Sequence, residues 1–154
     1  MIASELSRIE RKTLIRAPRA RVWRAITDIA EFSRWFGVVA EGAFAPGARL
    51  RMTSTHEGHT DVVFYVTVEE MTPERTFSWR WHPGMPDPGV DYSQEPATQV
   101  VFQLDEVAGG TLVTVTESGF DRISLARRAK AFEDNEAGWK IQMVSLEKYV
   151  GAAS

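Results

Sequence analysis

Apolar and polar residues change their spacing several times along the chain, and each change predicts a boundary between elements. In the segment 17–36, Val22, Ile26 and Ile29 recur at the spacing of a helix face. Pro18 precedes them and suits a first helical turn, because its ring fixes φ and it has no N–H. A second short helical turn ends in Trp35-Phe36, just before a glycine. The pattern therefore predicts two short helices, over 18–28 and 30–36.

Most of the remaining chain alternates with the period of two that is typical of a half-buried strand. Phe77, Trp79 and Trp81 occupy every second position, which predicts an inward-facing aromatic row. The intervening Ser78 and Arg80 are expected to face solvent. The predicted strands are 6–15, 38–44, 49–52, 60–70, 77–81, 98–106 and 111–118, the last two joined by a Gly109-Gly110 hairpin turn.

One long amphipathic helix is predicted over Ser124–Val150. Its apolar stripe is formed by Phe132, Trp139, Met143, Leu146 and Val150, with Leu125 and Ala129 leading into it. Strands joined by short turns form an antiparallel sheet, and the helix must bury its stripe against that sheet. We therefore predict a single α+β domain over 1–154, with space between sheet and helix wherever side chains do not meet.

Composition and length limit the function classes. The chain has 154 residues, 44% apolar and 25% charged, which is ordinary for one globular domain. No apolar run approaches the roughly 18 residues of a membrane span, and the N-terminus lacks a signal-peptide layout, so a cytoplasmic protein is expected. The absence of cysteine excludes disulfides, a thiolate nucleophile and cysteine-ligated metal.

Charge is unevenly distributed along the chain, although the net value is only −3. Residues 1–55 hold ten basic and five acidic side chains, whereas residues 56–106 hold two basic and ten acidic ones. The basic residues are spread over a predicted strand and helix, which indicates a solvated surface and no nucleic-acid partner. The asymmetry is also compatible with a homodimer, for which the outer face of the sheet around Val63 and Tyr65 is the expected surface.

Several motifs resemble a known family. They are Pro18–Asp28 with Val22-Trp23-Arg24-Ala25, then Trp35-Phe36, Gly47, Thr111–Phe120 (TLVTVTESGF) and Gly138-Trp139. The chain resembles the START-like (SRPBCC) superfamily with the helix-grip, or Bet v 1-like, fold, in the branch related to the heat-shock-protein-90 ATPase activator. This resemblance implies a curved sheet of about seven antiparallel strands around the last helix, with two small helices plugging one end. It also implies a ligand cavity between sheet and helix.

The candidate ligand-binding residues are mostly aromatic and lie on elements expected to face that cavity. Large rings suit ligand walls as well as cores, so both interpretations stay open for them. Trp81 is favoured for the cavity mouth because it adjoins the proline-rich loop 82–96. That loop is expected to form either a fixed rim or a lid of the cavity. Asn135 is a polar residue on an otherwise apolar helix face. The candidates are Phe36, Phe77, Trp79, Trp81, His82, Asn135, Trp139 and Met143.

Glu117 is the best acid–base candidate, and its orientation is open. If Val113 and Val115 face inward, Glu117 joins them by the period of two and its pKa is raised by burial. In the opposite register it lies in water. His56 and His59, with Asp61 nearby, lie in a turn and are interpreted as exposed residues. No metal and no cofactor are expected.

These observations favour a module that binds a small apolar or aromatic molecule over an enzyme. Two alternatives remain: a cyclase- or hydrolase-like enzyme using Glu117, His82 and Asn135, and a co-chaperone-like interaction module with a chaperone partner. The aromatic residues and the implied cavity carry the preferred interpretation.

Overall fold

Seven strands and three α-helices make up the part of the chain that the computed structural model describes, residues 8–84 and 90–153. The N-terminal end of the first predicted strand, residues 6–7, and residues 85–89 of the predicted loop lie outside it. The elements are β1 Arg8–Ile15, α1 Arg19–Thr27, α2 Ile29–Phe36, β2 Val38–Ala40, β3 Arg49–Ser54, β4 Val63–Thr72, β5 Thr76–Trp81, β6 Thr98–Val107, β7 Gly110–Ser118, a 3₁₀ turn η2 Phe120–Arg122, and α3 Leu125–Ala153.

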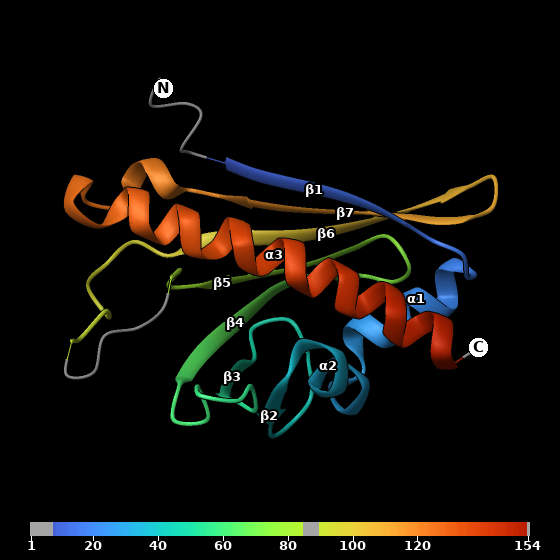
Figure 1. The fold of residues 1–154 in the computed structure, drawn as a ribbon, viewed down its shortest axis with the longest axis horizontal. Helices are drawn as coiled ribbons and strands as arrows, with labels where there is room; N and C mark the ends of the chain where they lie inside the picture. Colours follow the sequence, from blue (N-terminus) through green and yellow to red (C-terminus); the bar gives the residue numbers. More distant parts are fainter. Residues whose placement is uncertain (1–7, 85–89, 154) are drawn as a thin grey trace.

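The strands form one antiparallel sheet in the order β1-β7-β6-β5-β4-β3-β2. β1 and β7 therefore become neighbours although they are far apart in sequence. The helix α3 runs across the sheet, and α1 and α2 lie beside the C-terminal part of α3 (Figure 1). This is the helix-grip arrangement that the sequence resemblance implied, and the α+β prediction is confirmed.

Local sequence signals explain the two short helices. Asp28 ends α1 and caps α2, where its side chain accepts a hydrogen bond from the Glu31 backbone N–H at 3.0 Å. Gly37 ends α2 with φ 79°, a left-handed conformation that glycine adopts without steric cost. The Trp35 indole N–H donates to the Ala25 carbonyl at 2.7 Å and joins the two helices.

The core lies between the inner face of the sheet and the three helices. Phe77 and Trp79 are completely buried, as the predicted aromatic row requires. All five residues of the predicted stripe on α3, from Phe132 to Val150, are also buried. Leu125, however, is 80% exposed and Ala129 is exposed too, so their predicted place in the stripe is wrong. Buried positions on α3 begin only at Ala131, beyond its first turns.

Ser78 is a second correction, because it is only 2% exposed and does not face solvent. The pairing of β4 with β5 shifts register between Val68 and Met71, and the Ser78 hydroxyl accepts the Glu70 backbone N–H there at 3.0 Å. A bulge leaves such an N–H without its ladder partner. The buried Ser78 therefore accepts a hydrogen bond from a backbone N–H that a regular pairing of β4 with β5 would itself have satisfied.

Two predicted strands are shorter than expected. The second ends at Ala40 instead of Phe44, and β4 begins at Val63 instead of Thr60. Residues 56–62 instead form turns closed by backbone hydrogen bonds from His59 N–H to His56 and from Val62 N–H to His59. Of the helices described, none is long and apolar enough to cross a membrane.

Candidate functional site

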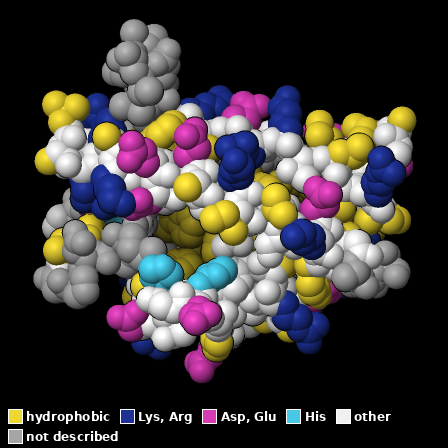
Figure 2. Space-filling view, viewed as in Figure 1, with side chains coloured by type: hydrophobic (Ala, Val, Ile, Leu, Met, Phe, Trp, Pro, Cys, Tyr) yellow, Lys and Arg dark blue, Asp and Glu magenta, His cyan; other side chains and the backbone are white. Residues whose placement is uncertain are grey.

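A cavity of about 720 Å³ opens between α3, the strands β3 to β5 and the segment that follows β5. In the space-filling view it is a hollow with apolar side chains at its base and two histidines on its edge (Figure 2). Apolar lining comes from Phe36, Val38, Phe64, Trp81 and Trp139. Polar lining includes His56, His59, Asp61, Tyr92, Asn135 and Gln142.

Three rings form one side of the cavity and contact one another. The Trp81 and Trp139 centroids are 5.8 Å apart, and Phe36 lies 6.1 Å from Trp139 and 6.3 Å from Trp81. Tilted and edge-on contacts at these separations are favourable for aromatic rings. The rings come from α2, β5 and α3, so the wall exists only when these elements are packed together.

Glu117 lies directly behind this wall. In β7 it is paired with Ile9 on one side and with Val100 on the other, and both of these residues are buried. Its side chain therefore points to the inner face together with Val113 and Val115, and it is 0% exposed. This settles the inward orientation that the sequence left open.

Four side chains donate hydrogen bonds to the Glu117 carboxylate. Trp139 Nε1 donates to Oε1 and Trp81 Nε1 donates to Oε2, each at 2.8 Å. Asn135 Nδ2 reaches Oε1 at 2.8 Å and Oε2 at 2.9 Å. The Thr98 hydroxyl donates to Oε2. A buried carboxylate without such partners is very unfavourable, so these donors make its burial tolerable.

Burial raises the pKa of Glu117 above its ordinary value, because a charge is poorly solvated in the core; the hydrogen bonds from Thr98, Trp139, Trp81 and Asn135 oppose this effect without cancelling it. The Thr98 hydroxyl also lies 3.5 Å from the Trp81 carbonyl. It can rotate to donate there and accept the proton of a neutral carboxyl. The network therefore accommodates both protonation states while the two indoles stay bound.

The predicted ligand-binding residues divide into two groups. Phe36, Trp81, His82, Asn135 and Trp139 are brought together along the cavity. Phe77, Trp79 and Met143 are buried in the core and are not among the lining residues.

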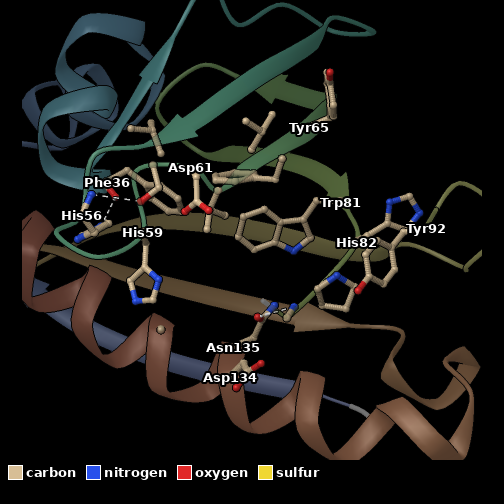
Figure 3. A pocket seen from close by; sticks show the side chains of 18 of the residues that line it. Phe36, His56, His59, Asp61, Tyr65, Trp81, His82, Tyr92, Asp134 and Asn135 are labelled. Atoms are coloured by element: carbon tan, nitrogen blue, oxygen red, sulfur yellow. Dashed lines mark hydrogen bonds between the residues drawn. The ribbon is translucent and has the colours of Figure 1, made fainter. Parts of the chain in front are cut away.

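Two predicted polar residues do not point into the cavity. Glu117 does not line the cavity but binds three residues that do. The ring of His82 contacts the Glu95 carbonyl, with Nε2 2.9 Å from the oxygen, and it points away from the cavity centre (Figure 3).

The prediction missed several lining residues, and four of them, His56, His59, Asp61 and Val62, come from the turn 56–62. Asp61 and His59 extend from this turn toward the cavity and toward α3 (Figure 3). The sequence pattern indicates exposed turn residues here and no ligand-binding role; the residues described contain no group of three or more metal-ligating side chains. One sequence pattern could have indicated the opposite side of the cavity. Asn135, Gly138 and Gln142 are spaced by three and four, so they share a helix face. In the structure they line the cavity across from this turn.

Gly138 leaves room on the helical side of the cavity. A Cβ built on it meets no heavy atom within 4 Å. Glycine within a helix is unfavourable by about 1 kcal/mol relative to alanine. The open space beside it lies in the cavity that it lines.

Comparison with solved structures shows the same fold in bacterial proteins. Protein MLL2253 from Mesorhizobium loti is 22% identical, with a TM-score of 0.76 over 96% of this chain and 98% of that one. A protein from Arthrobacter aurescens is 14% identical, with a TM-score of 0.79 over 99% and 90%. The Aha1 dimer from Colwellia psychrerythraea is 20% identical, with a TM-score of 0.69 over 93% and 95%.

The comparison with curated proteins finds no match. The family model described as "Activator of Hsp90 ATPase homolog 1-like protein" matches residues 16–151, from the end of β1 to the last turns of α3. With the fold, this match confirms the resemblance seen in the sequence: the chain belongs to the activator of Hsp90 ATPase homolog 1-like family of the SRPBCC superfamily.

Proposed function

We propose that this protein binds a small apolar or aromatic molecule in the cavity between α3 and the sheet. The observation that carries the proposal is the cavity of about 720 Å³ with one aromatic wall. Small-molecule sites in proteins are concave, mostly apolar and about 300–1,000 Å³ in volume. The mutually tilted rings of Phe36, Trp81 and Trp139 offer apolar faces and edges that an aromatic ligand can contact.

The polar groups favour binding over chemical conversion. A general acid or base must come within hydrogen-bond reach of the reacting atom. Glu117, the best such candidate in sequence, lies behind the wall and is fully hydrogen-bonded. His82 is turned toward the Glu95 carbonyl. The cavity is therefore better suited to hold a molecule than to transform it.

The test is to fill the cavity from the helix side. Gly138→Leu places a side chain in open space, whereas Ala137→Leu adds the same side chain at the neighbouring exposed position. Binding of 1-naphthylmethanol is measured by isothermal titration calorimetry. We expect the Gly138→Leu variant to bind at least about tenfold more weakly than wild type and Ala137→Leu to bind equally well.

Native mass spectrometry of freshly purified wild-type protein complements this titration, since a ligand retained from the host would appear as extra mass that is lost on denaturation. If wild-type protein does not bind the naphthalene probe, or if the Gly138→Leu variant binds it unchanged, the proposed function is wrong.

A further inference from the structure

The two indoles of the inner wall have no hydrogen-bond donor left for a ligand. The N–H groups of Trp81 and Trp139 are both used on Glu117. Asn135 uses Nδ2 on the same carboxylate, and its Oδ1 accepts the Gly84 backbone N–H at 2.9 Å. Since Glu117 lies behind the wall, both indole N–H groups are directed away from the cavity and the ring carbons face it.

The cavity mouth has the opposite character. Asp61 and His59 extend from the turn 56–62 and are exposed, and the phenol of Tyr92 lies on the other side of the opening (Figure 3). A polar group at the mouth therefore meets water, a carboxylate and an imidazole. The same group placed against the indoles would lose its water without gaining a partner.

We propose that the cavity takes amphipathic ligands in one orientation, with an apolar or aromatic end against Trp81 and Trp139 and a polar end at the mouth, and that Glu117 is the positioning residue that sets this polarity. The inference rests on the proposed function and adds the ligand class and its direction of entry.

The role of Glu117 follows from its acceptor atoms. Each indole binds a different carboxylate oxygen, Trp139 on Oε1 and Trp81 on Oε2. A glutamine at this position has only one acceptor oxygen, and its amide nitrogen can only donate. Whichever way the amide is turned, one indole N–H loses its partner. In a Glu117→Gln variant one indole is therefore no longer held with its N–H behind the wall, and its ring can turn the N–H toward the cavity.

Two probes of similar shape test the proposal. One is 1-naphthylmethanol, which is polar at one end, and the other is 1,5-bis(hydroxymethyl)naphthalene, which is polar at both. In wild-type protein we expect the second to bind at least about tenfold more weakly, because its inner hydroxyl is left without a partner. In Glu117→Gln we expect the ratio of the two dissociation constants to fall several-fold toward one, because an indole released from Glu117 can turn its N–H to the inner hydroxyl.

Thr98→Val is the matched control. It removes another buried donor to the same carboxylate but leaves both indoles paired, so the affinity ratio should stay at its wild-type value. A change that arose from loosened packing would appear in both variants. If Glu117→Gln does not fold, as judged by circular dichroism, the wild-type ratio still decides the ligand polarity.

The outcomes separate this inference from the proposed function. If neither probe binds, the proposed function fails. If both bind wild-type protein equally, the cavity is a binding site but this polarity is wrong. If the ratio is high in wild type and unchanged in a folded Glu117→Gln variant, Glu117 is not the positioning residue.

Discussion

The Trp139 indole N–H donates to Glu117 across 2.8 Å and thereby joins α3 to β7 inside the core. Trp139 faces the cavity with its ring and the carboxylate with its nitrogen. One side chain thus serves both the packing of helix on sheet and the lining of the cavity. Changes at Glu117 should consequently affect stability as well as binding.

Glu117→Gln should lower the free energy of unfolding by about 1–3 kcal/mol at pH 7, because one buried indole donor is left unsatisfied. The measurement is urea denaturation monitored by tryptophan fluorescence. Glu136→Gln is the control, since Glu136 is exposed on the same helix and a surface change of this kind stays within about 0.5 kcal/mol. Equal stability of the two variants would mean that the carboxylate network contributes little.

The stability contributed by Glu117 should depend on pH. Because its pKa is raised by burial above the ordinary 4.5, the folded protein holds this proton more tightly than the unfolded chain does. The advantage of wild type over Glu117→Gln is therefore largest below pH 4.5 and declines as pH rises through the raised pKa. Unfolding free energies of both proteins between pH 4 and 8 check this. An advantage that grows with pH would show that the hydrogen bonds outweigh burial.

Gly138→Ala should raise the free energy of unfolding by about 1 kcal/mol, because alanine is the better helix former and its methyl group enters open space. Thermal and urea denaturation measure the gain. The reverse exchange at the neighbouring exposed position, Ala137→Gly, should lower stability by a similar amount. A loss of stability in Gly138→Ala would indicate that the cavity is closed at this point.

Glu31 connects all three helices. It accepts hydrogen bonds from Arg21 and Arg24, each at 2.8 Å, and from the Tyr149 hydroxyl at 2.9 Å. Partial burial alone would raise the pKa of Glu31, but the hydrogen bond from Tyr149, the charge of Arg21 and the hydrogen bonds from both arginines outweigh it and lower the pKa.

Tyr149→Phe should therefore destabilise the protein by about 1 kcal/mol at pH 7. Since the folded-state pKa of Glu31 is lowered, its contribution is present above the ordinary 4.5 and is lost as pH falls through the lowered value. The difference between Tyr149→Phe and wild type should shrink in the same range. Urea denaturation at pH 7 and pH 3 measures it, and an undiminished difference at pH 3 would argue against the ionised Glu31 as the partner.

Local signals were sufficient for most elements. The spacing of Val22, Ile26 and Ile29 predicted α1, although Ile29 in fact begins α2, and the apolar stripe from Phe132 to Val150 predicted α3. Such periodicity reports which face of an element is buried. It does not report irregular pairing, so the buried position of Ser78 opposite the bulge in β4 was missed.

The sequence by itself determined the elements, the antiparallel class of the sheet and the family, because these depend on residue spacing and on motifs that are contiguous in the chain. Only the tertiary structure decided the site. Whether Glu117 faced inward depended on its pairing with Ile9 and Val100, which are 108 and 17 positions away in the numbering. Long-range packing brings both indoles to the carboxylate and places the turn 56–62 on the same cavity. No local pattern encodes that geometry.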